Sequence, residues 1–268
     1  MSLLSLEKVV KTFGGLTAVN RVSFSVEAGS VVGLIGPNGA GKTTVFNLIT
    51  GNYTPDSGDI RFNGVSIRGK KPHKIVEMGI ARTFQSIRLF QNMPVVENVL
   101  AGCHCRMKSG IFASMLRTPG QKREEKQALE TARKMLEFVG LWEQAGLLAS
   151  NLSYGKQRLL EIARALASGP ELLILDEPAG GMNDQETAEL LTLIREIGKM
   201  GITVLLIEHD MGLVMRACEK LVVIEYGTKI AEGGPEEVKN NPRVIEAYLG
   251  VEEEECEEIR NGDGESPC

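Results

Sequence analysis

Residues 36–44 read GPNGAGKTT, and this stretch decides how the rest of the chain is interpreted. It fits the pattern G-x-x-x-x-G-K-[ST], directly after the apolar run VVGLI and directly before the helical run TTVFNLIT. The glycines let backbone N–H groups curl around phosphates, Lys42 reaches the β and γ oxygens, and the Thr43 hydroxyl ligates Mg²⁺. A chance glycine turn is the alternative, but the flanking strand and helix favour a nucleotide site. The candidate residues of this phosphate loop are Gly36, Pro37, Asn38, Gly39, Ala40, Gly41, Lys42, Thr43 and Thr44.

The composition is that of a globular protein with one large domain. The 268 residues are 43% hydrophobic and 24% charged, which suffices for a well-covered core. The net charge of −5 comes from residues 251–268, where eight acidic residues and one arginine leave residues 1–250 with +2. This near-neutral body lacks the strongly basic face of nucleic-acid-binding proteins, so no nucleic acid partner is expected. The acidic tail has no apolar periodicity and is predicted to be disordered.

The cysteines and the apolar runs argue against a zinc-binding or disulfide-stabilised protein and against a membrane-spanning one. The five cysteines form no regular framework, and Cys103, His104 and Cys105 lie too close together for a zinc site. We expect free thiols in a reducing cytosol. Neither the N-terminus nor any later run approaches the length of a membrane span, so the sequence predicts a soluble chain or one held at a membrane by a partner.

Short apolar runs alternate with helical patterns along the chain. They are VVGLIG at 31–36, LLILDE at 172–177, TVLLIEH at 203–209 and LVVIEYG at 221–227. Continuous apolar strands between helices predict an α/β fold with a parallel sheet covered on both faces. The first thirty residues and GDIRFNGVSI (58–67) instead alternate apolar and polar positions around turns, which predicts an antiparallel side sheet.

The pattern between residues 88 and 151 is mainly helical and polar. Within QKREEKQALETARKMLEFVG (121–140) the apolar positions amid charge are Leu129, Met135, Leu136 and Val139. We interpret residues 88–155 as a helical subdomain inserted in a core that spans residues 1–250. The insert RMKSGIFASMLRTPG (106–120) is amphipathic, and it is either a surface loop packed on its subdomain or a contact at a membrane edge.

Polar side chains follow two of the apolar runs. LLILDEP delivers Asp176 and Glu177 together, so that Asp176 can hold the magnesium shell while Glu177 orients or deprotonates an attacking water. A surface acidic pair is the alternative interpretation. His209 follows another apolar run, and although a lone histidine is more often structural, ligands bind at such strand ends. Its imidazole is therefore a candidate contact to the γ-phosphate.

The stretch LSYGKQR, residues 152–158, precedes a helical pattern. Ser153 stands before apolar residues spaced like one buried helical face, namely Leu159, Leu160, Ile162, Ala163 and Leu166. The sequence therefore predicts Ser153 as the N-cap of a helix.

Taken in order, GPNGAGKTT, LSYGKQR, LLILDEP and LLIEHD resemble the motifs of the ATP-binding subunits of ABC transporters, over residues 1 to about 250. The resemblance implies a P-loop NTPase fold that binds ATP with Mg²⁺ and hydrolyses ATP to ADP and phosphate. It further implies that Phe13 stacks on adenine, that Gln85 links Mg²⁺ to the transport subunits, and that Asn183 lies in a loop crossing between subunits. From the residues alone, Phe13 is equally a candidate for the core of the side sheet.

The chain departs from the usual family wording, L-S-G-G-Q, at two positions. Tyr154 and Lys156 replace the third and fifth residues, while Ser153 and Gly155 remain. The resemblance implies that Ser153, Gly155 and Lys156 meet the ATP held by the phosphate loop of another subunit. Tyr154 is tolerable there if its side chain points away, and Lys156 adds a cation near the phosphate.

Further stretches, including IARTFQSIRLFQNMPVVENVLAG and NNPRVIEAYLG, resemble the branched-chain amino acid importer subclass. The implied partners are two integral membrane permease subunits and a second ATPase subunit, either a companion or an identical copy. A periplasmic or extracellular solute-binding protein takes part indirectly, and the chain is expected at the cytoplasmic face of the inner or plasma membrane. The alternatives are the ATPase of an amide, urea or other ABC transporter, a non-transport ABC ATPase, or a P-loop kinase.

Overall fold

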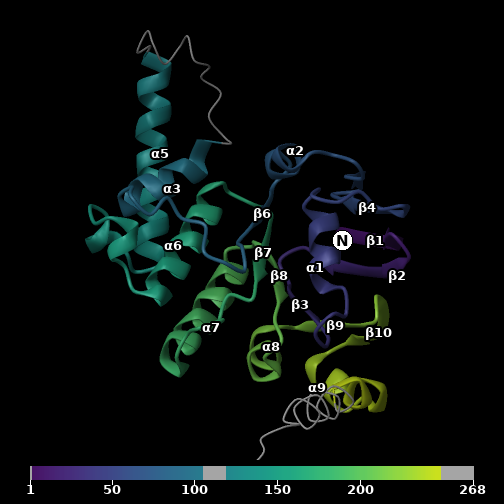
Figure 1. Cartoon of the computed structure of the whole chain (residues 1–268). Helices are drawn as coiled ribbons and strands as arrows, with labels where there is room; N and C mark the ends of the chain where they lie inside the picture. The colour runs from purple at the N-terminus through teal and green to yellow at the C-terminus, as the bar shows by residue number, and fades with distance from the viewer. Residues whose placement is uncertain (1, 105–118, 249–268) are drawn as a thin grey trace, which may run out of the picture. The chain divides into compact units, whose positions relative to one another are not determined.

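The computed structural model describes residues 2–104 and 119–248 (Figure 1). The chain forms two compact units. Among the described residues, unit 1 comprises 2–26, 32–69 and 207–248, and unit 2 comprises 27–31, 70–104 and 119–206.

Unit 1 contains the predicted antiparallel side sheet, with strand order β2-β1-β4-β5. Its strands are β1 (Ser2–Phe13), β2 (Leu16–Glu27), β4 (Ser57–Phe62) and β5 (Val65–Ser66). In the β1–β4 register, Leu4 pairs with Phe62 and Leu6 with Ile60, and all four side chains are buried. One apolar face of this sheet therefore forms a core, as the alternating pattern predicts.

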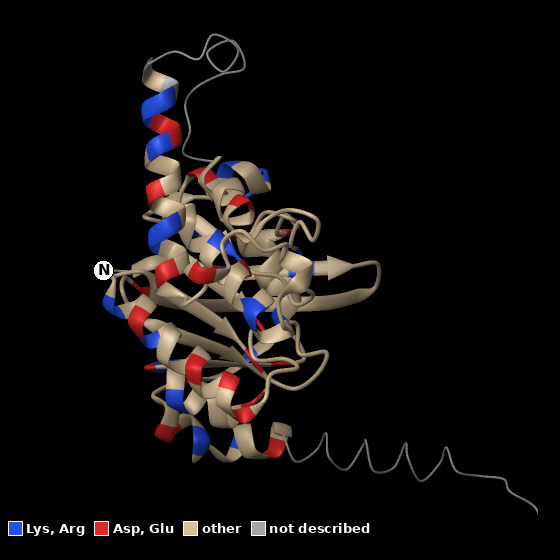
Figure 2. Ribbon diagram, turned by 90° about the vertical axis from the view of Figure 1, so that its left-hand side faces the viewer, with Lys and Arg blue, Asp and Glu red and all other residues tan. Residues whose placement is uncertain are grey.

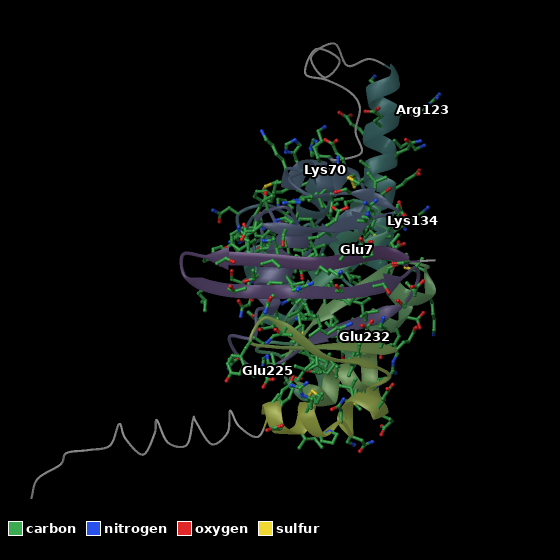
Figure 3. All side chains as sticks on the ribbon, turned by 90° about the vertical axis from the view of Figure 1, so that its right-hand side faces the viewer. Glu7, Lys70, Arg123, Lys134, Glu225 and Glu232 are labelled. Carbon is green, nitrogen blue, oxygen red and sulfur yellow. The ribbon has the colours of Figure 1, made fainter. Side chains whose placement is uncertain are left out.

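The second group of strands in unit 1 leads to the phosphate loop. It consists of β3 (Val31–Ile35), β9 (Lys220–Glu225) and β10 (Thr228–Gly233) in the order β10-β9-β3. Strand β3 is parallel to β9, whereas β10 is antiparallel to β9. Glu232, which is labelled together with Glu225 in Figure 3, forms ion pairs with Lys220 and Lys229. The helices of unit 1 are α1 (Lys42–Ile49), α8 (Met211–Ala217) and α9 (Pro235–Lys239).

Unit 2 has its own run of strands, in the order β8-β7-β6. They are β6 (Ile80–Arg82), β7 (Leu172–Asp176) and β8 (Thr203–Ile207), and β6 is parallel to β7. Both longer strands are buried throughout, as expected for strands covered on both faces. Strand β6 was not predicted, because three residues are too few to show a periodic pattern. Two helices accompany these strands in the chain, α2 (Pro72–Glu77) and α7 (Asp184–Lys199).

The predicted helical region also lies in unit 2. The helices α3 (Val95–Cys103), α5 (Pro119–Phe138) and α6 (Tyr154–Ala167) pack against one another (Figure 1). Two short 3₁₀ turns, Trp142–Gln144 and Ala149–Asn151, connect α5 to α6.

The apolar positions of α5 are not all buried, because Leu129 is 49% exposed. The buried stripe of α5 is instead Ala128, Ala132 and Leu136, whose spacing of four residues puts them on one face. Alanines at the contact let neighbouring helices approach closely, while acidic and basic residues recur along α5 (Figure 2).

Two sequence expectations, for most of the amphipathic insert and for the acidic tail, lie outside the described residues. Within residues 2–104 and 119–248, no helix is long and apolar enough to cross a membrane. The same residues contain no group of three or more His, Cys, Asp or Glu side chains arranged for a metal ion. Cys103 and Cys218 are buried free thiols, in agreement with the sequence, and Cys105 is outside the described part.

Candidate nucleotide site

The phosphate loop connects β3 to α1 and needs glycine at two of its positions. Gly36 and Gly41 have φ angles of 151° and 101°. A Cβ atom at Gly36 would lie 2.0 Å from the carbonyl oxygen of Ile224, and one at Gly41 would lie 2.5 Å from that of Ala18. Only glycine fits at both positions, so the sequence fixes the path of the loop backbone.

Lys42 begins α1 and is held within the loop. Its side chain is buried, and Nζ donates hydrogen bonds to the carbonyl oxygens of Gly36 (2.7 Å) and Pro37 (2.9 Å). The N-cap Gly41 has no side chain to accept from the first turn of α1, and Thr43 in that turn is exposed. A cation, an uncapped helix N-terminus and a hydroxyl thus lie together, which is the arrangement that phosphate groups require.

Phe13, at the end of β1, is exposed rather than buried in the side sheet. Its side chain is 40% exposed and packs edge to face on Tyr53, with ring centroids 5.1 Å apart. Lys11 Nζ lies 5.4 Å from the centre of the Phe13 ring. The structure therefore excludes the core interpretation of Phe13 and leaves its ring accessible to a ligand.

In unit 2, parallel pairing brings Gln85 to Glu177. Strand β6 pairs with β7 through Arg82 and Ile174, so the residues that follow the two strands emerge at the same edge. Gln85 Nε2 donates to Glu177 Oε2 at 2.9 Å. Two residues 92 positions apart in the sequence thus share a hydrogen bond.

The acidic pair differs in environment and in backbone conformation. Asp176 is 8% exposed, and its backbone N–H lies 3.4 Å from the hydroxyl of Thr83. Glu177 is partly exposed and has φ 45°, a left-handed conformation that costs a non-glycine residue about 1–3 kcal/mol. Such strain persists where the surrounding structure imposes it, and it is frequent at functional sites. The environment of Glu177 therefore favours a site over a solvated surface pair.

His209 lies just after the end of β8. Its side chain is 62% exposed, with Nδ1 3.9 Å from the carboxylate of the buried Glu208. The next residue, Asp210, caps α8 by accepting the N–H of Leu213 at 3.1 Å. The imidazole is thus at the surface at a strand end, where the sequence predicts it.

Ser153 is the N-cap of α6, which confirms the prediction from its sequence. Its hydroxyl accepts the N–H of Lys156 at 3.5 Å. A Cβ atom at Gly155 would lie 2.4 Å from Glu186 Oε1, so the start of α6 closely approaches the carboxylate of this α7 side chain. The Tyr154 hydroxyl accepts a hydrogen bond from Arg158 Nη2 at 3.3 Å, and Arg158 lies one turn further along the helix. The tyrosine is therefore accommodated by its own helix.

Asn183 is the N-cap of α7. Its side chain accepts the N–H of Glu186, and the Glu186 carboxylate accepts the N–H of Asn183, which forms a capping box. This contact accounts for asparagine at the position in structural terms. Its role between subunits stays a prediction.

Three side chains near these residues were not identified from the sequence. Arg158 and Glu161 are buried in α6 although their charges place them outside its apolar pattern. Tyr248 lies beside the Gly36 N–H, and burial raises the pKa of its hydroxyl to about 12, although that N–H opposes the rise. A buried polar side chain of this kind is recognised from the group that it contacts in the folded chain. Sequence periodicity does not identify that group.

The predicted residues are distributed over both units. Unit 1 holds Phe13, the phosphate loop and His209, and unit 2 holds Gln85, Ser153, Gly155, Lys156, Asp176, Glu177 and Asn183. Within unit 2 the structure joins Gln85 to Glu177 directly and packs Gly155 on the start of α7.

Comparisons with known proteins agree with this geometry. Residues 19–180 match the family model described as ABC transporter, and residues 228–254 match that of the branched-chain amino acid ATP-binding cassette transporters. The chain is 49% identical to the high-affinity branched-chain amino acid transport ATP-binding protein LivG of Salmonella typhimurium, covering 92% of this chain and 98% of LivG. It is 48% identical to BraF of Pseudomonas aeruginosa over the same shares of the two chains.

Solved structures show the same fold. The ADP conformation of MJ1267, an ATP-binding cassette of an ABC transporter, has a TM-score of 0.82 and 37% identity, covering 93% of this chain and 99% of that chain. A nucleotide-free cassette has a TM-score of 0.80 and 36% identity over 92% and 99%. The phosphate loop, the strand-end carboxylates and these likenesses identify the chain as a member of the ATP-binding subunits of ABC transporters, and therefore as an ATPase.

Proposed function

We propose that this chain powers an importer of branched-chain amino acids through ATP hydrolysis at the cytoplasmic face of the membrane. The observation that carries the proposal is the 49% identity to LivG over 92% of the chain. A likeness of that extent runs far beyond the nucleotide motifs, which all ABC ATPases share. The match of residues 228–254 to a model specific to branched-chain amino acid cassettes adds independent support. Membership in the ABC family removes the P-loop kinase alternative.

The proposed complex contains two integral membrane permease subunits and a second ATPase subunit, either a companion or an identical copy. A periplasmic or extracellular solute-binding protein would deliver the amino acid, and no nucleic acid takes part. The permease subunits would hold this chain at the inner or plasma membrane.

The site residues have distinct proposed roles. Phe13 stacks on adenine, residues 36–44 bind the phosphates, and Lys42 reaches the β and γ oxygens. Glu177 acts as general base toward the attacking water, while His209 contacts the γ-phosphate. Ser153, Gly155, Lys156 and Asn183 act toward the nucleotide of the neighbouring ATPase subunit.

We propose that Mg²⁺, which prefers oxygen ligands together with several waters, is held by oxygen atoms of three side chains. Thr43 offers an exposed hydroxyl, Asp176 a carboxylate and Gln85 an amide oxygen. The Gln85 amide nitrogen is occupied by Glu177, which leaves its oxygen as the acceptor for a cation. When bound, the ion would neutralise charge on the β and γ oxygens.

The substrate is tested by uptake into vesicles that contain the complex co-purified from its native membranes. With ATP inside the compartment that this subunit faces, we expect uptake of labelled leucine, isoleucine and valine, and none of urea or short amides. The same complex carrying Glu177→Gln serves as the inactive control. Uptake of urea or amides without leucine uptake would assign the chain to the alternative transporter class.

Phe13→Ala is expected to weaken ATP binding by about 1–3 kcal/mol, the range for aromatic stacking on a base. The exposed ring of Phe13 supports this expectation, because its loss disturbs no core. Titration calorimetry with ATP measures the change. Leu16→Ala, at the 70% exposed start of β2, is the matched control and should bind ATP normally. Equal affinity in the Phe13 variant and the unchanged protein would remove Phe13 from the site.

Phe90→Asp is expected to abolish ATP-driven uptake while the isolated subunit retains its basal ATPase activity. Phe90 is 52% exposed in the region 85–99, which we propose as the permease docking surface, whereas Ile87, Leu89 and Met93 are partly buried. Its backbone N–H and carbonyl are both bound by Asn98, so the substitution changes the surface without releasing the segment.

The matched control is Val65→Asp, which introduces the same charge at a 53% exposed apolar residue of β5. Uptake by the assembled transporter and phosphate release by the free subunit are measured for both variants. Normal uptake with Phe90→Asp would place the docking surface elsewhere.

A further inference from the structure

The segment from Phe84 to Phe90 has neither helix nor strand, and its backbone is held by side chains of α6. Arg158 Nη1 donates to the carbonyl oxygen of Phe84 at 2.6 Å, and Nη2 donates to that of Gln85 at 2.8 Å. One guanidinium group therefore binds two successive peptide carbonyls, with the paired donors that only arginine offers. The peptide that carries Gln85 is thus attached to α6.

Further contacts from the helices hold the rest of the segment. Glu161 Oε1 accepts the N–H of Arg88 at 3.3 Å, and Arg164 Nη1 donates to the carbonyl of Arg88 at 2.5 Å. Asn98 of α3 binds both backbone groups of Phe90. These hydrogen bonds attach the segment to both α3 and α6.

The charged groups that hold the segment are buried. Arg158 and Glu161 side chains are each 1% exposed and form an ion pair at 3.1 Å, and Arg164 lies 3.7 Å from the same carboxylate. Burial raises the pKa of Glu161, while the Arg88 N–H and the two arginines oppose the rise. A buried ion pair stabilises a fold little compared with apolar residues of similar volume, so a positional role accounts better for these charges. Arg158 Nε has no hydrogen-bond partner among the described residues, so the guanidinium favours the two carbonyls over full satisfaction of its own donors.

The same guanidinium also contacts the beginning of α6. Arg158 Nη2 donates to the hydroxyl of Tyr154, the first residue of the helix, which follows the N-cap Ser153. At the other end of the connection, Gln85 donates to Glu177 at 2.9 Å. A continuous chain of contacts therefore runs from Tyr154 through Arg158 and the Gln85 peptide to Glu177.

We propose that Arg158 is a positioning residue for ATP hydrolysis, which ties Gln85 to the start of α6. A displacement of Ser153 toward a nucleotide then changes the contact between Gln85 and Glu177. Glu161 holds the guanidinium in place, and Tyr154 provides the second attachment where the family wording has glycine. The inference rests on the proposed function, because it takes Gln85, Glu177 and Ser153 as site residues.

Arg158→Lys in the full-length chain tests the proposal. Lysine keeps the charge beside Glu161 but does not bind two carbonyls in a fixed fork. We expect kcat to fall about 10- to 100-fold, the scale for a misplaced catalytic group, while KM for ATP stays within about twofold. Arg133→Lys is the matched control, since Arg133 pairs with Glu137 at the surface of α5, and its kcat should not change.

A double-mutant cycle with Gln85→Ala separates positioning from a merely structural role. If Arg158 acts through Gln85, Arg158→Lys changes kcat by less than about twofold once Gln85 is alanine. An equal loss of kcat in both backgrounds, accompanied by a lower Tm, would overturn the proposal in favour of a structural role. Unchanged kcat in Arg158→Lys, with a clear loss in Gln85→Ala, would overturn the inference and leave the proposed role of Gln85 intact. If Gln85→Ala itself has full kcat, the proposed role of Gln85 fails and the inference fails with it.

Tyr154→Phe provides a second route if the Arg158→Lys variant does not fold. It removes only the hydroxyl that receives Arg158 Nη2, and the half-exposed ring remains. We expect a fall in kcat of about 2- to 5-fold, consistent with one lost hydrogen bond, and no further fall in the Gln85→Ala background. Unchanged kcat in the folded Tyr154→Phe protein would overturn the proposal.

Discussion

Replacement of Glu177 by glutamine is expected to reduce ATP turnover by about 10²–10⁴-fold, the contribution typical of a general base. Glutamine has nearly the same shape as glutamate, and an amide does not accept the proton of the attacking water. Glu177 follows the buried strand β7 and has a left-handed backbone conformation, and its carboxylate accepts a hydrogen bond from Gln85. The phosphate loop is not altered, so the affinity for ATP should be retained. Phosphate release at saturating ATP and an independent binding titration provide the two readouts.

Glu196→Gln is the matched control for this result. Glu196 is half-exposed on α7 and pairs with Lys199, so the same change of charge there should leave turnover unaltered. Retention of more than about a tenth of the turnover by Glu177→Gln would exclude Glu177 as the general base, because that loss falls below the general-base range.

The sequence was sufficient where a local pattern determines local structure. The glycines at 36 and 41 predict the phosphate loop. A Cβ atom at either position would clash with a backbone carbonyl oxygen, so only glycine fits there. Ser153 caps its helix as predicted, and strands β3, β7 and β8 are buried throughout, as continuous apolar runs indicate. In each case the determining residues are neighbours in the chain.

Contacts between distant segments could not be predicted in this way. The hydrogen bond from Gln85 to Glu177 depends on the pairing of β6 with β7, and β6 is too short to recognise from its sequence. The burial of Arg158 depends on two carbonyl groups that lie more than seventy residues earlier. The exposure of Leu129 was not evident from the sequence, because Ala128 and Ala132 occupy the buried face of α5 together with Leu136. In all three cases the partner, and not the residue type, decides the environment.

The departure of Tyr154 from the family wording shows how the two kinds of information combine. From the sequence, the tyrosine was acceptable only if its side chain pointed away from the phosphate. In the structure, the Tyr154 hydroxyl accepts a hydrogen bond from Arg158 at 3.3 Å. Ser153 remains exposed at the start of α6. The residue type alone did not reveal this contact with Arg158, which tyrosine makes and glycine cannot make.

Glu177→Gln is further expected to accumulate a dimer in the presence of ATP, and adding Ser153→Arg should prevent its formation. The helix α1 begins at the phosphate loop without a capping side chain, and α6 begins at the exposed Ser153. The N-terminus of each helix favours negative charge, so the α6 of one subunit can close the γ-phosphate held by the loop of another. ATP that is not hydrolysed would then stabilise the bridged state by mass action. An arginine at position 153 would fill the space that the phosphate needs.

Light scattering measures the molar mass with and without ATP, and the companion ATPase is included because the proposed partner is either a companion or an identical copy. Ser150→Arg is the matched control, since it introduces the same bulk and charge at an exposed serine three residues before Ser153. It should leave the ATP-dependent dimer intact. A Glu177→Gln sample that stays monomeric with ATP and the companion present would contradict a nucleotide shared between subunits. A dimer that survives Ser153→Arg as well as Ser150→Arg would show that the subunits associate without α6 reaching the phosphate, because only the first substitution obstructs that approach.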